Sequence, residues 1–519
     1  MSPQHRRDAT LQSVVASLGA DYSTTVLSLT ILFHPHTGRI GESWEHPLSA
    51  QTLMLEIGRH QPEFGLHPET SAPSALDDPH ISRQALRLEV SAKAVQLHKY
   101  PGACRCKVQG RELKETIDLE ASLMSRGVTL QLGHGVVLWM RLGASRQLPG
   151  STAAIDTGAL AMLGNSACMV RLRQQIARAA ATDLDVLVLG ETGTGKELTA
   201  AALHETSART DRPFVPINMS AIPVALAPAL LFGSTRGAYT GAVKASEGYF
   251  QQAHHGTLFM DEVGDTPEEI QPQLLRVLQQ RQVQIVGGSL QSVDLRVIAA
   301  TDVELESEDC HFSAALRHRL GAVEIRVPAL RDHPEDIGEL LLHFLHEAAA
   351  EMGCEALLPA ATDGDIRTAL WAEVFQLFAR YDWPGNIREL ANAARQLMVA
   401  SEHEVRVPEH LLQRLQQARA NGQDSALRPM SEVGVDQFRE AFLGNDYEVA
   451  ATARALGVSR QSIYRRLDES PDLRLASDVA DDELREALVA VDGDARQAAR
   501  VLAVSYKGLR VRLRSSGML

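Results

Sequence analysis

The stretch LDVLVLGETGTGK, residues 184–196, decides the fold of the central part of the chain. An apolar run ends in a glycine-rich loop, and the helical pattern of residues 197–203 follows it. A phosphate-binding loop requires this context, because glycines let backbone N–H groups close around phosphate oxygens at a helix N-terminus. Lys196 would reach the outer phosphates. The predicted nucleotide-binding residues are Gly190, Glu191, Thr192, Gly193, Thr194, Gly195, Lys196 and Glu197.

Length and composition indicate an ordinary globular protein of several domains. The chain has 519 residues, 45% of them hydrophobic and 22% charged, and this length suggests about three domains. Its net charge of -14 argues against a surface covered by nucleic acid, although a local DNA-binding module is compatible with it. The first residues lack an apolar signal core, and no apolar run approaches the ~18 residues of a membrane span, so we expect a cytoplasmic protein. Five scattered cysteines without a CxxC spacing predict neither disulfides nor a zinc site.

The pattern of apolar and polar residues changes along the chain. Residues 22–144 alternate with period two, as at Leu53, Leu55 and Ile57, which predicts an all-β sandwich. Residues 145–158 have linker composition. In residues 159–333 apolar strands (184–189, 257–260 and 295–300) alternate with helical periods, which predicts an α/β core on a parallel sheet. A helical stretch (334–416), a second linker (417–434) and an all-α end (435–519) follow.

The all-α end contains an internal repeat. Residues 438–467 align without gaps to residues 484–513, with 11 of 30 positions identical. Copy one reads as a helix, a turn at Gly457, an N-cap at Ser459 and a second helix, which is the helix-turn-helix pattern. Ile463 and Leu467 would lie on its core face, whereas copy two has Gly508 in the second helix and its role stays open. The predicted DNA-binding residues are Ser459, Arg460, Gln461, Ser462, Tyr464 and Arg465.

One hexapeptide indicates what nucleotide hydrolysis is used for. GAYTGA, residues 237–242, follows Leu231-Phe-Gly233 and resembles the GAFTGA loop of the bacterial enhancer-binding activators of sigma-54 RNA polymerase, which are AAA+ ATPases. The P-loop form GETGTGKE, with Glu197 where the general motif has Ser or Thr, is similar to that family, and the repeat resembles its Fis-type helix-turn-helix. The resemblance implies an AAA+ core (159–333) with a helical lid (334–416), ATP and Mg²⁺ as cofactors, a homo-oligomeric ring, and sigma-54 RNA polymerase holoenzyme and upstream enhancer DNA as partners. The implied sigma-54 contact residues are Gly237, Ala238, Tyr239, Thr240, Gly241 and Ala242.

The same resemblance assigns the catalytic residues. Asp261 and Glu262 end an apolar strand as a Walker B motif does, so Asp261 would help hold Mg²⁺ and Glu262 would polarise the attacking water. Asn218 matches the switch asparagine that holds the Walker B glutamate. Arg388, in WPGNIREL, matches the nucleotide-sensing arginine of sensor II.

Two positions depart from the family pattern. Sensor I reads Thr301-Asp302 instead of Thr-Asn, which places a carboxylate near the phosphates. Arg319 matches the second of two trans-acting arginines, but Ser313 stands at the first, and whether Arg317 replaces it is left open. These departures favour the alternative of a DNA-bound, phosphopeptide-responsive scaffold or repressor with weak or lost ATPase activity.

The N-terminal sandwich resembles a forkhead-associated (FHA) domain, which binds phosphothreonine. The resemblance rests on Gly58-Arg59 and on Ser82-Arg83. It implies that Arg59 and Ser82 meet the phosphate of a phosphothreonine protein and that Arg83 supports them. Ala85 replaces the family's histidine, and Gln109-Gly110 replaces its Asn-Gly clamp, so a degenerate, purely structural sandwich is the alternative.

Overall fold

The computed structural model divides into two compact units, residues 1–415 and residues 416–519. No helix in the part of the chain that it describes is long and apolar enough to cross a membrane. The described residues are 25–48, 52–65, 72–91, 94–145, 162–238, 244–303, 305, 312–361, 364–401, 404–423, 433–445, 447–456, 463, 466–467, 479, 481–491, 494–502 and 504–515.

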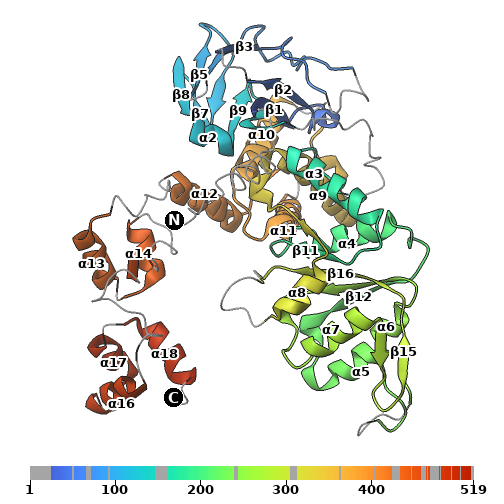
Figure 1. Ribbon diagram of the computed structural model, residues 1–519. Helices are drawn as coiled ribbons and strands as arrows, with labels where there is room; N and C mark the ends of the chain where they lie inside the picture. Colours follow the sequence, from blue (N-terminus) through green and yellow to red (C-terminus); the bar gives the residue numbers. More distant parts are fainter. Residues whose placement is uncertain are drawn as a thin grey trace, which may run out of the picture. The chain divides into compact units, whose positions relative to one another are not determined.

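The N-terminal strands form two antiparallel sheets that pack face to face (Figure 1). The first has the order β2-β1-β10-β9-β6-β7 and the second the order β3-β4-β5-β8. Leu86, Leu88 and Val90 are buried between the sheets while Arg87 is exposed, so the period-two prediction of a sandwich is confirmed. The elements are β1 (Thr25–Phe33), β2 (Ser43–Pro47), β3 (Leu53–Ile57), β4 (Leu86–Val90), β5 (Ala94–Lys99), β6 (Cys106–Val108), β7 (Arg111–Glu112), β8 (Thr116–Glu120), α2 (Ala121–Arg126), β9 (Val128–Leu132) and β10 (Val136–Ala144).

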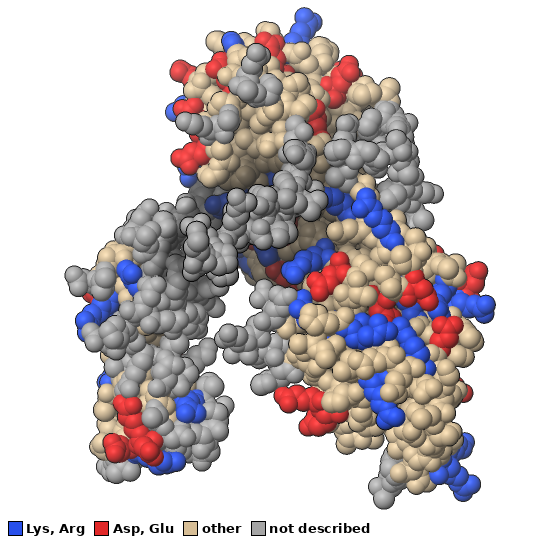
Figure 2. Space-filling view, in the orientation of Figure 1, with Lys and Arg blue, Asp and Glu red and all other residues tan. Residues whose placement is uncertain are grey.

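The central part is a parallel sheet of order β12-β13-β16-β11-β17 with helices on both faces. Val186 and Val188 pack with α3 and α4, and Leu187 packs on the opposite face with α7 and α8. The three predicted strands are present as β11, β13 and β16. On the face that Figure 2 shows, acidic and basic side chains are interspersed over this core. The elements are α3 (Ala167–Ala180), β11 (Val186–Leu189), α4 (Lys196–Glu205), β12 (Phe214–Asn218), α5 (Ala227–Phe232), α6 (Tyr249–Gln252), β13 (Thr257–Asp261), α7 (Gln271–Gln280), β14 (Gln282–Gln284), β15 (Leu290–Ser292), β16 (Arg296–Thr301), α8 (Ala314–Leu320) and β17 (Val323–Arg326).

A helical subdomain follows the sheet and also contacts the sandwich. It consists of α9 (Ile337–Met352), α10 (Asp365–Ala379), α11 (Asn386–Ala400) and α12 (Glu409–Gln423). The rings of Phe33 in β1 and Phe375 in α10 lie 4.9 Å apart between centroids. A Cβ at Gly338 would lie 2.4 Å from the carbonyl oxygen of Leu32, so the backbone of α9 lies directly on that strand. α12 continues to Gln423, so the start of the expected linker (417–434) is helical, as its Gln, Ala and Arg residues favour.

The C-terminal unit contains two helical groups with equivalent cores. The first has α13 (Val435–Gly444) and α14 (Val449–Leu456), and the second has α16 (Asp481–Ala490), α17 (Ala495–Val501) and α18 (Tyr506–Ser515). Ile463 and Leu467 are buried as predicted, and their repeat equivalents Leu509 and Leu513 are buried in the second group. The predicted DNA-binding residues Ser459, Arg460, Gln461, Ser462, Tyr464 and Arg465 lie outside the described residues.

Candidate nucleotide site

The glycine-rich loop joins β11 to α4 at the carboxyl edge of the sheet. Gly193 and Gly195 have φ of +80° and +97°, which side chains rarely adopt, and a Cβ at Gly193 would lie 2.5 Å from the carbonyl oxygen of Gly385. Lys196 begins α4 and is buried. Its Nζ donates to the carbonyl of Gly190 at 3.0 Å and lies 3.8 Å from Oε1 of Glu262. The predicted loop residues and Glu262 therefore meet at one place.

Asp261 and Glu262 lie at the end of β13, next to the loop. Oδ1 of Asp261 is buried and has no hydrogen-bond partner among the described residues. A buried carboxylate oxygen without a donor fits a role in holding Mg²⁺ or its water, because that ion prefers oxygen ligands. Glu262 has a left-handed φ of +49° and is about one-fifth exposed, at 22%. The pair thus offers one carboxylate for a metal and one for water.

The carboxylates in this site influence one another. Burial raises the pKa of Glu262, Lys196 opposes the rise, and the charges of Asp302 and Asp261 add to it. The pKa of Asp302 is lowered, first because the hydroxyl of Thr192 donates to it and also because Lys196 is near. The sensor I carboxylate noted in the sequence is therefore bonded to the P-loop itself. Thr301, beside it, is buried, and its Oγ1 accepts the N–H of Val303 at 3.1 Å.

Asn218 lies at the end of β12, where its Cα is paired with that of Asp261. Its Oδ1 accepts the N–H of Ser220 at 2.9 Å and the hydroxyl of the same residue at 2.7 Å. Within the described residues no hydrogen bond joins it to Glu262. The structure places Asn218 at the site edge but bonded to its own turn.

The lid reaches the loop through residues that the sequence analysis did not single out. Nδ2 of Asn386 donates to the carbonyl of Thr192 at 3.1 Å and to Oε2 of Glu191 at 3.2 Å, while its Oδ1 accepts the N–H of Leu330 at 2.9 Å. Arg331 pairs with Glu191, and this bond holds the pKa of the Glu191 carboxyl at about 2. Asn386 stands inside the quoted WPGNIREL motif, so the motif was visible although the contact was not.

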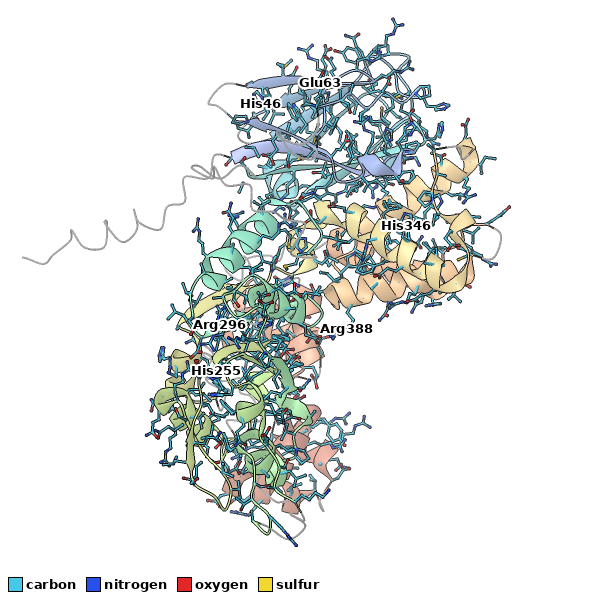
Figure 3. All side chains as sticks on the ribbon, turned by 90° about the vertical axis from the view of Figure 1, so that its right-hand side faces the viewer. His46, Glu63, His255, Arg296, His346 and Arg388 are labelled. Carbon is cyan, nitrogen blue, oxygen red and sulfur yellow. The ribbon has the colours of Figure 1, made fainter. Side chains whose placement is uncertain are left out.

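Arg388 projects from the first turn of α11 and is exposed (Figure 3). The backbone N–H of the preceding Ile387 donates to the carbonyl of Gly193 at 3.0 Å. The start of α11 is thus fixed on the P-loop, and Arg388 stands beside that contact.

The candidate trans-acting arginines are engaged within their own subunit. Arg319 donates to the carbonyl of Leu278 at 2.8 Å and lies 3.5 Å from the buried carboxylate of Asp185. Arg317 pairs with Glu324 at 3.2 Å. Ser313 caps α8, since its hydroxyl accepts the N–H of Leu316 at 3.4 Å, which gives the serine at this position a structural role.

The structure describes the base of the GAYTGA segment. α5 ends at Phe232, and Gly233 follows it with φ of +81°. A Cβ at Gly248 would lie 2.3 Å from the backbone nitrogen of Gly233. Ser234 and Ser246 exchange two backbone hydrogen bonds of 2.9 Å. Ala238 lies against Gly287, in the turn between β14 and β15, and Gly237 precedes it. The remaining predicted contact residues, Tyr239, Thr240, Gly241 and Ala242, lie outside the described residues.

The predicted phosphopeptide residues lie on the loops of the sandwich. Nε of Arg59 donates to the carbonyl of Ile81 at 3.0 Å, and its Nη2 donates to that of Pro79. The hydroxyl of Ser82 accepts the N–H of Cys104 at 2.8 Å, and Arg83 is exposed. Arg59 and Ser82 thus hold the loops of the sandwich through hydrogen bonds to their backbone.

Known protein families match the central part of the chain in two consecutive segments. A family model described as the sigma-54 interaction domain matches residues 162–326, and one described as the AAA+ ATPase lid domain matches residues 331–427. The transcriptional regulatory protein ZraR of Escherichia coli (strain K12) is 37% identical over 337 residues, which cover 63% of this chain and 72% of ZraR. This chain belongs to the sigma-54 activator family.

Two further similar proteins match over a smaller share of their length. The DNA-binding transcriptional regulator NtrC of Rhizobium meliloti is 39% identical over 264 residues, which cover 50% of this chain and 52% of NtrC. A crystal structure of NtrX from Brucella abortus in complex with ADP has 30% sequence identity, covers 60% of this chain and 70% of that chain, and gives a TM-score of 0.42. As a member of this family, the chain carries an ATP-binding AAA+ domain with a lid, and this domain is an ATPase.

Proposed function

We propose that the chain is a sigma-54-dependent transcriptional regulator that uses ATP hydrolysis in a homo-oligomeric ring to open promoter DNA. The observation that carries this proposal is the meeting of Lys196, Asp261 and Glu262 at one sheet edge, with the lid bonded to the loop. This arrangement can bind a nucleoside triphosphate, hold its metal and orient a water.

Each side chain of the site has a distinct role in the proposed reaction. The P-loop amides and Lys196 bind the phosphates, and Asp261 would hold Mg²⁺, which neutralises phosphate charge when bound. Glu262 must be ionised to polarise the water, so its raised pKa sets the acidic limit of activity. Arg319 is our candidate for the arginine given to a neighbouring subunit, and its release from Leu278 would accompany ring assembly.

The partner-binding surfaces lie on the three parts of the chain. The GAYTGA loop would carry the motion of the site to sigma-54, with Tyr239 and Thr240 as contacts and the paired Gly233 and Gly248 as its fixed base. The Fis-type helix-turn-helix would bind upstream enhancer DNA. The FHA-like sandwich would bind a phosphothreonine protein through Arg59, Ser82 and Arg83.

Asp302 favours a second candidate, a DNA-bound phosphopeptide-responsive scaffold or repressor with weak ATPase activity. Its carboxylate is bonded to Thr192 of the P-loop and adds negative charge where phosphates bind. The steady-state rate at which the chain hydrolyses ATP decides between the two candidate functions.

Two variants test the proposal. Deletion of Thr240 should leave ATP hydrolysis close to that of the parent and abolish open-complex formation by sigma-54 polymerase. Glu262→Gln should abolish both. If promoters open normally with the Thr240 deletion, the proposed role of the loop is wrong.

A further inference from the structure

Three side chains of metal-binding type converge at the contact between the sandwich and the lid. His80 precedes β4, His134 lies in the turn between β9 and β10, and Asp365 is the first residue of α10. Oδ1 of Asp365 lies 3.8 Å from Nε2 of His80 and 3.6 Å from Nε2 of His134. The two imidazole rings meet edge to face, with centroids 4.1 Å apart. Residues from three distant segments thus turn one nitrogen or oxygen each toward a common point.

The two histidines are held in place by their loops. The N–H of His80 donates to Oδ1 of Asp78 at 2.8 Å, and Arg59 bonds to the carbonyls on either side of this histidine. Gly133 has φ of +61°, and a Cβ there would lie 3.0 Å from the carbonyl oxygen of His80, so the two loops are in close backbone contact. The carbonyl of His134 accepts from Gln131 at 3.2 Å. Both rings are therefore presented by fixed backbone.

The distances from Asp365 to the two histidines suit three ligands of one ion better than direct hydrogen bonds between the side chains. Among the described residues none of the three side chains makes a hydrogen bond, and the two distances from Oδ1 of Asp365 to the histidine nitrogens exceed hydrogen-bond length. Around a tetrahedral ion with bonds of about 2.0–2.1 Å, ligand atoms lie roughly 3.3–3.4 Å apart. The two distances from Asp365 exceed that spacing by only a few tenths of an ångström, and all three ligand atoms lie within 4.8 Å of one another, so small side-chain movements bring them to one ion.

We propose that His80, His134 and Asp365 bind one divalent transition-metal ion, with Zn²⁺ as the expected ion. Two imidazoles and one carboxylate suit Zn²⁺, whereas Mg²⁺ and Ca²⁺ prefer oxygen ligands alone. The three side chains are 44%, 29% and 74% exposed, so water can fill the fourth position and the ion can exchange with solvent.

The site links two parts of one unit. Close to the site, a Cβ at Gly135, next to His134, would lie 2.6 Å from Cγ2 of Thr368 in α10. Just beyond the other end of α10, Nη1 of Arg380 donates to the carbonyl of Gln109 in the sandwich at 2.6 Å. A metal ion bound by side chains of both parts adds coordination bonds that form only when the sandwich and the lid are in contact. Metal binding therefore stabilises the contact between the sandwich and the lid.

Titration of the full-length chain with Co²⁺ tests the site. After removal of metals with EDTA, and without nucleotide or Mg²⁺, Co²⁺ should bind with one equivalent per chain and give the visible absorption of a four-coordinate nitrogen and oxygen site. Zn²⁺ should displace it. A band from sulfur coordination would place the ion at a cysteine and overturn the proposal.

Three variants complete the test. Asp365→Asn and His134→Gln should weaken Co²⁺ binding at least about tenfold and remove the rise in thermal midpoint that Zn²⁺ gives the parent. Asp365 is a surface side chain, so its variant is expected to fold. The matched control is His343→Gln, which removes a comparable pair, His343 and Glu347 at 3.4 Å. Equal affinity in the parent and in Asp365→Asn, or equal loss in the control, would overturn the assignment.

Discussion

Replacing Asn386 with alanine should separate the lid from the P-loop. The side chain is fully buried and has three partners, of which the N–H of Leu330 is itself buried. Leaving such a group unpaired costs about 1–3 kcal/mol. The left-handed φ of +52° costs alanine about 1 kcal/mol more. We therefore expect a destabilisation of about 3 kcal/mol, which corresponds to a fall of about 6–12 °C in the unfolding midpoint of a domain of this size.

Calorimetry of the full-length chain, with ATP affinity measured by fluorescence titration, checks this value. The affinity should also weaken, because Asn386 bonds to Thr192 in the loop that would bind the phosphates. Asn392→Ala is the matched control, since Asn392 is exposed on the same helix. An Asn386→Ala chain that unfolds within about 2 °C of both the parent and the control would refute the reasoning, because one unpaired buried donor alone predicts a larger fall in the unfolding midpoint.

Three further variants examine the site. Glu262→Gln should bind ATP but hydrolyse it at least about 100-fold more slowly in a steady-state assay, and near-normal turnover would exclude this glutamate as the base. Asp302→Asn should raise turnover about fivefold, equal to about 1 kcal/mol, since a neighbouring negative charge is removed. In the parent, the pH at which activity is lost on acidification should lie above the ordinary glutamate pKa of 4.5, because burial and Asp302 raise the pKa of Glu262. This acid limb of the pH–rate profile should move to lower pH in Asp302→Asn, and an unmoved limb would contradict the assignment. Gly193→Ala should lose ATP binding in a filter assay, because its Cβ would lie 2.5 Å from the carbonyl of Gly385, and retained affinity would show that the loop adapts.

Local patterns predicted the elements well. The alternation at Leu86, Leu88 and Val90 places those side chains between two sheets, and the burial of Val186 and Val188 follows from an apolar strand covered on both faces. The P-loop and the strand ending in Asp261 also depend on short-range signals. These features could be predicted because each is encoded within a few neighbouring residues.

The contacts between distant segments could not be predicted in this way. Nothing local in Glu191 indicates that Arg331 pairs with it, or that Asn386 bonds across to the P-loop. The same holds for Asp365, which meets two histidines only because α10 packs on the sandwich. Such pairs depend on how the lid and the sandwich pack, and a single sequence does not contain that geometry.

Opening of a sigma-54-dependent promoter is the most direct test of the proposed function. With sigma-54 polymerase, enhancer DNA and this chain, reactivity of unpaired thymines at the start site should appear with ATP and be absent with ADP. A promoter served by another sigma factor should not respond. No ATP-dependent opening by a chain that hydrolyses ATP would contradict the account.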